Sequence, residues 1–483
     1  MRLFLDKLGA VTDWRSGETW SAAQIRAQTN GLAAELTRLG IRPGSRVITW
    51  HGGDGRFFAD LFAIWQVGAC AVGLNPNTTA SELQTIADFV KPAAIIDRNC
   101  DRIPETLGAL AISSESIAPI SSERILGSGH LDDDALILFT SGTTGTPKGV
   151  VHTFRSLLAR VALNQAYIPR GHRMRTLCVL PTHFGHGLIG NCLTALLDGQ
   201  DLFLAPASNL DVPANLGSII DEHKISFMSS VPALWKRVTN EAKPPTDDTL
   251  RRVHVGSAPL SADLWTAIGE WAQTDQVFNM YGITETANWL AGVALSERDA
   301  ADGLIGTMWG GNIAVRNAEG NIAAEGEGEL IVQSPSLMKC YYQLPEKTDE
   351  VLRDGWFHTG DIGRIDAEGM AYLTGRERYL INRGGLKVHP EDVDLLLERH
   401  EIVSEACTFA VPHATEGETV GVALALQAGA KFDERQIRRW CAERLSREKI
   451  PVHWFIVKEV PKTDRGKINR DVVAAYCLDG AED

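Results

Sequence analysis

The first part of the chain alternates between helical and extended patterns, and this alternation limits the fold more than any other feature. Residues 21–40, SAAQIRAQTNGLAAELTRLG, carry apolar residues at helical spacing between a serine N-cap, Ser21, and a terminating glycine, Gly40. The run SRVITW, residues 45–50, is typical of a strand, and residues 57–75 indicate a helix followed by another strand. The sequence therefore predicts an α/β architecture with layered sheets.

The pattern changes in the last third of the chain. Residues 318–335 form short extended runs separated by Gly and Asn turns, and residues 370–400 indicate a hairpin, a glycine loop and a helix. Residues 433–445, DERQIRRWCAERL, are typical of an amphipathic helix, and residues 450–473 are typical of a strand followed by a polar loop. We therefore expect a second, smaller α+β unit here.

Composition excludes several classes of protein. A chain of 483 residues with 44% hydrophobic and 22% charged residues is typical of a soluble globular protein. The N-terminal apolar run is interrupted by Asp6 and Lys7, so we expect neither a signal peptide nor a membrane span, and a cytoplasmic location. A formal net charge of -14 disfavours nucleic acid and anionic membranes as partners. The eight cysteines are scattered singly, which predicts buried thiols and no zinc site.

The stretch LFTSGTTGTPKGV, residues 138–150, has almost no side chain to bury. It lies between a predicted strand, residues 135–140, and a predicted helix, residues 152–163. Backbone N–H groups and hydroxyls in such a run can bind phosphate oxygens, and Lys148 adds a positive charge. It is not a GxxxxGK[ST] loop, because Lys148 is followed by Gly149. The alternative for the segment alone is a flexible surface loop.

Five segments in order resemble the adenylate-forming superfamily, which comprises acyl-CoA synthetases, firefly-type luciferases and peptide-synthetase adenylation domains. They are LFTSGTTGTPKGV, MYGITET, GWFHTGDIG, GRERYLINRGGLKVHPEDV and PKTDRGKINR, and the resemblance extends from about Trp20 to about Arg470. It implies the adenylate-forming enzyme fold, an α/β fold with a large N-terminal domain of several subdomains at 1–377. A small mobile α+β domain at 378–483 would follow a hinge near Arg378.

The resemblance implies that a carboxylate attacks the α-phosphate of ATP to form an acyl-AMP, from which a thiol then displaces AMP. Two anions meet in the first step, so cations and Mg²⁺ must neutralise the developing charge. The implied catalytic residues are Lys467, Thr284 and Glu285, and Glu285 is also the implied Mg²⁺ ligand. The residues implied to bind ATP or AMP are Thr140, Ser141, Gly142, Thr143, Thr144, Gly145, Thr146, Lys148, Ser257, Ala258, Pro259, Tyr281, Gly282, Asp361, Arg376 and Lys387.

The smaller domain would also serve the thiol. Gly384 and Gly385 are implied to line a pantetheine tunnel, because glycine lets a chain approach the backbone closely. Arg378 stands where the family often has Asp or Lys. Each motif also has a structural alternative: a helix cap for the Thr-x-Glu run, a turn for Asp361, a hairpin for the glycine pair and a solvated strand position for Lys387.

The segment LPTHFGHGLIGN, residues 180–191, bears on the acid that is activated. It lacks the aspartate with which peptide-synthetase domains bind an α-amino group, so an amino acid substrate is disfavoured. Phe184 stands where many acyl-CoA synthetases have histidine, and the segment is more similar to benzoate-CoA ligases. We predict an aromatic or short-to-medium apolar acid. The candidate acyl pocket comprises His183, Phe184, His186, Gly187, Met228, Ser229, Gly256 and Trp289. An HxxH pair without a third ligand is more typical of structure than of metal binding.

The predicted small-molecule partners are ATP, a carboxylic acid and coenzyme A. No carrier-protein serine motif follows Arg470, so the acceptor would be a separate molecule, either coenzyme A or a free-standing carrier protein with the same pantetheine thiol. The resemblance allows a homodimer. Two other classes remain open: a phosphoryl-transfer enzyme, which the glycine-rich loop alone would suggest, and a non-catalytic nucleotide-binding relative.

Overall fold

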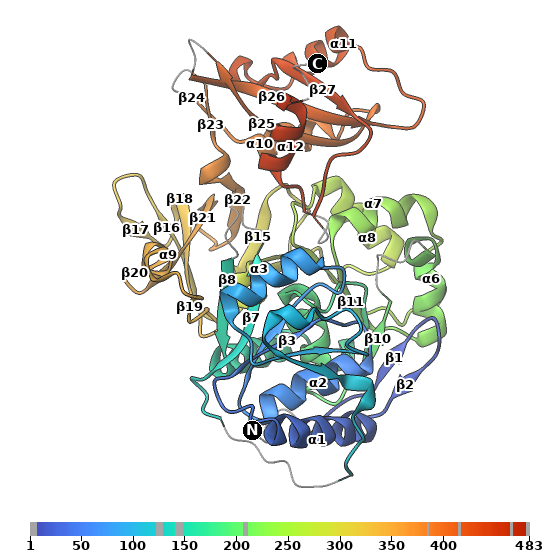
Figure 1. The fold of residues 1–483 in the computed structure, drawn as a ribbon. Coiled ribbons are helices and arrows are strands. Elements are labelled where there is room, and N and C mark those ends of the chain that lie inside the picture. Colours follow the sequence, from blue (N-terminus) through green and yellow to red (C-terminus); the bar gives the residue numbers. More distant parts are fainter. Residues whose placement is uncertain are drawn as a thin grey trace. The chain divides into compact units, whose positions relative to one another are not determined.

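Figure 1 shows the computed structural model, which describes residues 7–121, 129–140, 148–205, 211–383, 386–413, 417–463 and 467–479. The chain forms two compact units, each assembled from separate stretches. The first comprises Met1–Ala300, Thr307–Asn312 and Gln333–Phe357, and the second comprises Ala301–Gly306, Ile313–Val332 and His358–Asp483.

The first unit contains a seven-stranded sheet in the order β19-β8-β7-β4-β3-β5-β6. The strands from β7 to β6 are parallel, whereas β8 is antiparallel to β7, and β19 is antiparallel to β8. The bounds are β3 (Arg46–Thr49), β4 (Cys70–Gly73), β5 (Ala94–Asp97), β6 (Leu110–Ser113), β7 (Asp134–Thr140), β8 (Lys148–Thr153) and β19 (Cys340–Tyr341).

A second run of strands in this unit has the order β14-β13-β12-β11-β9-β10-β1-β2. The strands from β13 to β1 are parallel, and they bury polar side chains such as Thr176, Ser229 and His254 together with their apolar ones. The bounds are β1 (Val11–Asp13), β2 (Thr19–Trp20), β9 (Arg175–Cys178), β10 (Asp201–Leu204), β11 (Phe227–Ser230), β12 (Arg252–Gly256), β13 (Val277–Gly282) and β14 (Trp289–Ala294).

Helices cover these sheets, as the ribbon in Figure 1 shows. They are α1 (Ala22–Arg38), α2 (Gly55–Gln66), α3 (Ala80–Val90), α4 (Phe154–Tyr167), α5 (Thr194–Leu196), α6 (Asp211–His223), α7 (Pro232–Glu241) and α8 (Ala262–Ala272), and a further short helix, α9 (Pro345–Val351), follows β19. Short 3-10 turns occur at Glu105–Leu107, Ser114–Ser116, Arg170–His172 and η6 (Thr284–Thr286), and a π-helix, η5, spans His186–Leu193.

The predicted α/β alternation is confirmed, and its local causes are visible. Ser21 caps α1 in a capping box with Gln24, and Gly40 follows the helix with a φ of 83°, a conformation that glycine adopts without strain. Helix α2 is capped by Asp54 and buries nearly every side chain, as expected for a helix between two sheet strands.

The predicted helix at 152–163 begins later than the sequence indicated. Residues Lys148–Thr153 continue as strand β8, which pairs with β7 through Leu138 and Val150, and α4 begins at Phe154 with Thr153 as its N-cap. The valines of KGVVHT favour an extended backbone. The glycine-rich segment therefore connects two antiparallel strands and does not lead directly into a helix.

The second unit carries two sets of strands. One set has the order β17-β16-β18-β21-β22, and the other has the order β24-β23-β26-β25 with β27 beside β26. Strands β15 (Leu304–Met308), β16 (Asn312–Arg316), β18 (Gly326–Gln333) and β21 (Trp356–Ile365) contain residues of both units, and β20 (Leu352–Arg353), which pairs with β21, belongs to the first unit. The other bounds are β17 (Ile322–Ala323), β22 (Ala371–Arg376), β23 (Ile381–Arg383), β24 (Leu386–Val388), β25 (Val403–His413), β26 (Gly417–Leu426) and β27 (His453–Val457).

Helices α10 (Pro390–Leu397), α11 (Glu434–Ala442) and α12 (Arg470–Asp479), with 3-10 turns at η7 (Glu377–Tyr379) and Arg447–Lys449, complete the second unit. The hairpin, the helix after it and the amphipathic helix are as predicted, and Ile437 and Cys441 form the buried side of α11. All eight cysteines are free; Cys100 and Cys340 are partly exposed and the others are buried.

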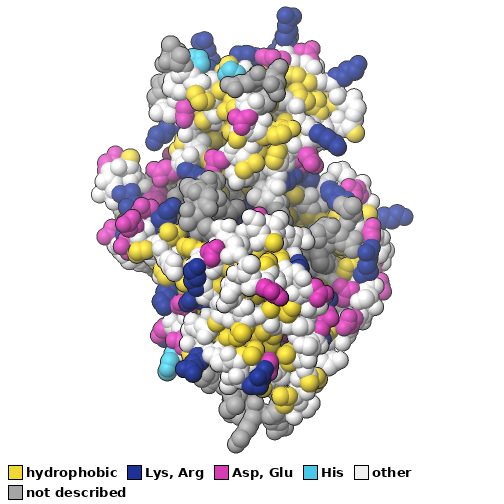
Figure 2. Space-filling view, viewed as in Figure 1, with side chains coloured by type: hydrophobic (Ala, Val, Ile, Leu, Met, Phe, Trp, Pro, Cys, Tyr) yellow, Lys and Arg dark blue, Asp and Glu magenta, His cyan; other side chains and the backbone are white. Residues whose placement is uncertain are grey.

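The surface and the helix lengths bear on membrane and nucleic-acid binding. Within the described ranges, every helix is too short or too polar to cross a lipid bilayer. Figure 2 shows acidic, basic and apolar side chains mixed over the displayed face, where Lys and Arg side chains stand singly or in small groups among the coloured residues. An extended nucleic-acid backbone is bound by continuous basic areas, and the coloured part of this face has none.

Candidate active site

The loop predicted to bind phosphates begins where β7 ends. Thr140 is the last residue of β7, and Lys148 is the first of β8. Six of the predicted phosphate-binding residues, Ser141, Gly142, Thr143, Thr144, Gly145 and Thr146, lie outside the described residues. The two strands nevertheless fix where the loop starts and returns.

Lys148 and Glu285 meet beside this loop, although 136 residues separate them in the sequence. The Lys148 ammonium lies 3.3 Å from Glu285 Oε1, and 12% of the Glu285 side chain is exposed. Tyr341 contacts both residues: its hydroxyl donates to Glu285 Oε1 at 2.7 Å, and its ring lies 3.9 Å from the Lys148 ammonium. Burial raises the pKa of Glu285, but Lys148 and the Tyr341 hydroxyl outweigh it, and the net pKa is below the usual value.

The turn that carries Thr284 and Glu285, η6, is held by backbone contacts. The imidazole of His152 on β8 is fully buried, and its Nε2 donates to the Thr284 carbonyl at 2.8 Å. Burial lowers the pKa of His152 to about 4, so the ring is neutral at physiological pH. The Met338 N–H donates to the Glu285 carbonyl at 2.7 Å. The main chain of the motif is therefore held from two sides, by β8 and by the segment that carries Met338.

A buried guanidinium connects this turn to helix α4. Arg160 donates to the Ser336 hydroxyl at 2.7 Å, to Ser334 at 3.2 Å and to the Trp309 carbonyl at 3.3 Å. Ser336 in turn donates to the Thr286 carbonyl at 3.0 Å. Burial lowers the pKa of Arg160 only to about 10, so it stays charged at pH 7.

Replacing Arg160 by methionine should destabilise the first unit without removing a predicted site residue. The hydroxyls and the carbonyl that Arg160 serves would lose their donor, which costs ~2–4 kcal/mol in the free energy of unfolding. Urea denaturation followed by tryptophan fluorescence measures the change. Arg155→Met on the same helix is the matched control, because Arg155 makes an exposed ion pair with Asp132. Equal effects of the two substitutions would contradict the role of the Arg160 network.

The residues predicted to lie against adenine come from neighbouring strands. Tyr281 and Gly282 end β13, and Gly256 ends the adjacent parallel strand β12. Tyr281 is buried. A Cβ added to Gly282 would lie 2.3 Å from the Asn288 carbonyl oxygen, so only glycine fits at this position.

Ser257 follows Gly256 with a φ of 69°, a left-handed conformation that is uncommon for a residue with a side chain. Ala258 and Pro259 come next and lead to Ser261, the N-cap of α8. A strained residue is retained when its surroundings over-determine it.

His186 contributes to the surroundings that hold Ser257 in its left-handed conformation. Its Nδ1 lies 2.7 Å from the Ser257 hydroxyl and its Nε2 lies 2.5 Å from the Ser229 hydroxyl. The Trp289 ring contacts His186 edge-on with the ring centroids 5.6 Å apart. The predicted acyl residues and the predicted nucleotide segment are thus joined through one imidazole.

The other predicted pocket residues lie around His186. Phe184 is buried, and its ring contacts both His183 and His186. Gly187 continues η5 after His186. Met228 and Ser229 are consecutive in β11, so their side chains point to opposite faces of the sheet, and Met228 does not share the face of Ser229 that meets His186.

Within the second unit, the two predicted ribose contacts lie side by side. Asp361 on β21 and Arg376 on β22 are register partners, and Arg376 Nε lies 2.8 Å from Asp361 Oδ1. The Asp361 side chain is 2% exposed and that of Arg376 is 46% exposed. The arginine therefore orients a buried carboxylate while it remains accessible itself.

The remaining predicted residues also belong to the second unit. Arg378 lies in η7 and donates to Asp471 at 2.6 Å and to the Tyr379 hydroxyl at 2.6 Å. Lys387 is exposed on β24. Lys467 is also exposed, and its carbonyl accepts a hydrogen bond from the Thr463 N–H at 2.8 Å. Gly384 and Gly385 lie outside the described residues.

The carboxylate beside the phosphate loop is suited to a metal ion that binds together with a nucleotide. Among the described residues there is no group of three or more His, Cys, Asp or Glu that could hold a metal ion by itself. Glu285 offers one ionised carboxylate beside the phosphate loop, and Mg²⁺ is commonly held by one or two carboxylates together with phosphate oxygens and water. The residues therefore fit Mg²⁺ that arrives with a nucleotide.

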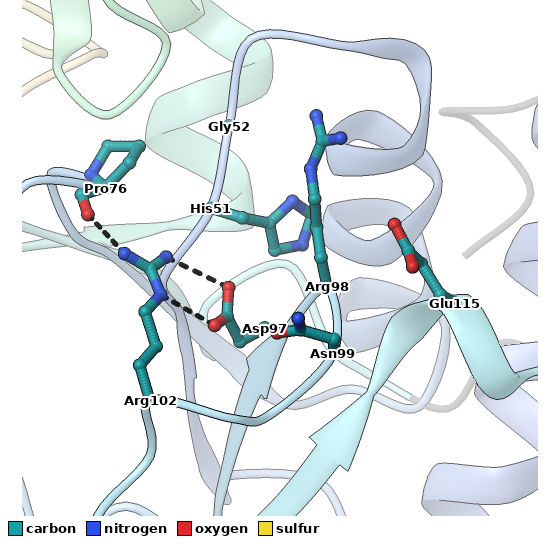
Figure 3. A pocket seen from close by; sticks show the side chains of 8 residues that line it. All are labelled: His51, Gly52, Pro76, Asp97, Arg98, Asn99, Arg102 and Glu115. Atoms are coloured by element: carbon teal, nitrogen blue, oxygen red, sulfur yellow. Dashed lines mark hydrogen bonds and ion pairs between the residues drawn. The ribbon is translucent and has the colours of Figure 1, made fainter.

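A cavity of about 390 Å³ lies elsewhere in the first unit, at the carboxyl ends of β3 and β5. It is lined by His51, Gly52, Pro76, Asp97, Arg98, Asn99, Arg102 and Glu115. Figure 3 shows Arg102 paired with Asp97 and with the Pro76 carbonyl, and Arg98 pairs with Asp54. No residue predicted for the active site lines this cavity, and its arginines are already neutralised by aspartates.

Three contacts at the site were not predicted from the sequence. Tyr341 contacts Glu285 and Lys148, His152 contacts the Thr284 carbonyl, and Arg160 reaches the Thr286 carbonyl through Ser336. His152 and Arg160 occur in apolar stretches that are typical of a core, and a hydrophobic pattern does not show which residue of such a stretch meets a turn that is distant in the sequence. The one available signal was the single histidine and the single arginine at positions that a core would otherwise fill with apolar residues.

Comparisons with known proteins identify the family. The family described as AMP-binding enzyme matches residues 6–342, and the one described as AMP-binding enzyme C-terminal domain matches residues 392–467. The chain is 30% identical to an oxalate--CoA ligase of Arabidopsis thaliana, over 91% of this chain and 90% of the relative. It is 32% identical to a probable CoA ligase, CCL9, of Humulus lupulus, over 94% and 91%.

Among solved structures, ATP-bound MatB from Rhodopseudomonas palustris superposes with a TM-score of 0.86 at 25% identity, covering 98% of each chain. The chain belongs to the AMP-binding enzyme family. The predicted membership of the adenylate-forming superfamily and the predicted fold class are therefore confirmed. The roles assigned to individual residues remain predictions.

Proposed function

We propose that this chain is an ATP-dependent acid–thiol ligase, which activates a carboxylic acid as acyl-AMP and transfers the acyl group to coenzyme A. The observation that carries the proposal is the contact between Lys148 and Glu285 at the base of the phosphate loop, in a chain of the AMP-binding enzyme family. A buried carboxylate beside a lysine is the arrangement that a magnesium–nucleotide substrate needs. The curated relatives that resemble the chain over nine-tenths of its length are named as CoA ligases, which supports the thiol acceptor.

In the first half-reaction the carboxylate oxygen of the acid attacks the α-phosphorus, and pyrophosphate leaves. Lys148 and the loop before it bind the β- and γ-phosphates, and Thr284 contacts the α-phosphate. Lys467 bridges the acid carboxylate and the α-phosphate, where negative charge accumulates. Mg²⁺, held by Glu285 together with phosphate oxygens, would supply charge neutralisation at the nucleotide. Positioning and electrostatics together carry most of such a reaction.

The residues that we assign to the nucleoside fall into two groups. Tyr281 and Gly282 would lie against adenine with the Ser257–Ala258–Pro259 segment, and the close contact of Gly282 with the Asn288 carbonyl fixes the end of β13 there. Asp361 accepts from the ribose hydroxyls, with Arg376 as a second ribose contact. Lys387 contributes a charge at a phosphate.

In the second half-reaction a pantetheine thiol displaces AMP. We divide the chain for this purpose into an N-terminal domain, 1–377, and a mobile C-terminal domain, 378–483, that rotates near Arg378. Gly384 and Gly385 then line the passage for pantetheine. Coenzyme A is the proposed acceptor, and a free-standing carrier protein presenting the same thiol is the alternative.

The acid is an aromatic or short-to-medium apolar molecule. Phe184 and Trp289 provide apolar surface, and His186 with Ser229 provides a polar end to the pocket. Such a lining selects mainly through the shape of its apolar part, where one methylene changes selectivity by about 10–200-fold.

The test is a panel of carboxylic acids incubated with ATP, Mg²⁺ and hydroxylamine. Acid-dependent hydroxamate with AMP and pyrophosphate supports the proposal. Formation of ADP or inorganic phosphate without AMP would replace it by a phosphoryl-transfer function. Adding coenzyme A or a phosphopantetheinylated carrier protein in place of hydroxylamine then identifies the acceptor.

Replacing Phe184 by alanine should change the preference among acids more than the affinity for ATP. The ring contacts His183 and His186 and lies in the apolar part of the pocket, so its loss enlarges the acyl site. We expect kcat/KM ratios between large and small acids to shift by ~10-fold or more, with KM for ATP within about twofold. A changed KM for ATP with an unchanged acid profile would place Phe184 outside the acyl pocket.

A further inference from the structure

Tyr341 occupies an unusual position for a residue that no sequence motif marks. It ends β19, where it pairs with Val150 of β8, two residues beyond Lys148. Its side chain is buried, with 3% of the residue exposed. The register therefore brings the ring to the strand that leaves the phosphate loop.

One side chain here contacts both members of an ion pair. The Tyr341 hydroxyl donates to Glu285 Oε1 at 2.7 Å, and the face of the ring lies 3.9 Å from the Lys148 ammonium. The ammonium and the carboxylate oxygen are 3.3 Å apart. The Tyr341 hydroxyl and the Lys148 ammonium therefore both contact the same carboxylate oxygen, Glu285 Oε1.

Each contact offsets a different part of the free energy needed to hold this ion pair in place. A largely buried carboxylate needs hydrogen bonds and a counter-charge to stay ionised. A lysine on a flexible stem loses rotamer freedom when it is held, and an aromatic face partly compensates through a cation–π contact. Tyr341 therefore contacts the buried carboxylate and the ammonium at the same time and limits the movement of both.

We propose that Tyr341 is a positioning residue that holds Glu285 and Lys148 in place for the magnesium nucleotide, with the hydroxyl acting on Glu285 and the ring acting on Lys148. This rests on the proposed function. Lys148 serves as the counter-charge of Glu285 until Mg²⁺ and phosphates arrive, and it then exchanges the carboxylate for a phosphate oxygen. The ring keeps the ammonium near both positions.

Two substitutions separate the two contacts. Tyr341→Phe removes the hydroxyl and keeps the ring, whereas Tyr341→Leu removes both. Tyr342→Phe is the matched control: the same oxygen is removed one position later, where the hydroxyl faces the Val90 carbonyl at 3.4 Å and the ring packs on Phe89.

The measurement is ATP binding by calorimetry with and without Mg²⁺, in the absence of any acid, so that no turnover is required. In Tyr341→Phe, the gain in ATP affinity that Mg²⁺ confers should fall by about tenfold, the scale of a hydrogen bond to a charged group, while the Mg²⁺-free affinity stays within twofold. Tyr341→Leu should also lower the Mg²⁺-free affinity, by about fivefold, because Lys148 loses its aromatic support. Tyr342→Phe should leave both affinities within twofold of the parent.

A parent protein that binds ATP more tightly with Mg²⁺, together with a Tyr341→Phe variant that keeps the whole gain, would overturn this role while leaving the proposed function intact. A parent that binds no ATP would instead contradict the proposed function. If Tyr341→Phe is less stable, the same substitution in a Glu285→Ala background decides the question. If the hydroxyl acts through Glu285, adding Tyr341→Phe to Glu285→Ala should change the gain in ATP affinity from Mg²⁺ by less than twofold. A full tenfold change in that background would exclude this role.

Discussion

Lys467→Ala is expected to slow acyl-adenylate formation by ~10²–10³-fold, the scale of losing one well-placed electrostatic group, and to leave transfer from a supplied acyl-adenylate nearly unchanged. The first half-reaction brings two anions together and needs the ammonium, whereas the second expels AMP from a molecule already formed. Pyrophosphate release measures the first, and thioester formation from synthetic acyl-AMP and coenzyme A measures the second. Lys458→Ala, which removes an exposed lysine from the same part of the chain, is the control.

A substitution at the proposed hinge residue, Arg378, should have the opposite effect. Arg378→Pro fixes φ and deletes the side chain that pairs with Asp471 and Tyr379, so it should impair thioester formation more than pyrophosphate release. The two variants would then fail in opposite half-reactions, which agrees with a domain rotation that exchanges the residues facing the reacting atoms. Equal loss of both half-reactions in a folded Lys467→Ala variant would rule out the two-conformation mechanism.

Glu285→Gln is expected to lower ATP turnover by ~10²-fold or more, with the largest loss at limiting Mg²⁺. Glutamine keeps the shape and can still accept from Tyr341, but it has no charge for a divalent cation and leaves Lys148 without its counter-charge. Acid-dependent AMP formation over a Mg²⁺ titration measures the effect.

Glu346→Gln, an exposed site on α9, makes the same chemical change away from the loop and serves as the control for Glu285→Gln. Turnover of Glu285→Gln that matches the parent protein at limiting Mg²⁺ would remove Glu285 from its assigned role.

Local signals predicted much of the fold. The N-cap at Ser21, the glycine after α1 and the amphipathic pattern of α11 each depend on neighbours within a few residues, and all three are present. The sequence predicts too early a start for α4. Val150 and Val151 pair with β7 as part of strand β8, but the helical spacing of apolar residues begins at nearly the same point and hides this strand.

The site was predicted less completely, for a physical reason. Glu285 and Lys148 carry charge within recognisable motifs, so their types suggested phosphate and metal chemistry. The importance of Tyr341 arises only when β19 pairs with β8 and places a ring against both residues. The alternation of β11, in contrast, was available from the sequence: Met228 and Ser229 are neighbours in a strand and could not both face one pocket.

The imidazole between Ser229 and Ser257 has a consequence for protein engineering. Because His186 contacts Ser229 of the proposed acid pocket with one nitrogen and the left-handed Ser257 with the other, we expect a substitution that reshapes the pocket at this position also to release the segment proposed to lie beside the nucleotide. Libraries that vary His186 would mix altered selectivity with weakened cosubstrate binding. Phe184, whose ring contacts that imidazole edge-on, offers a starting point from which we expect the range of accepted acids to widen with less effect on the segment.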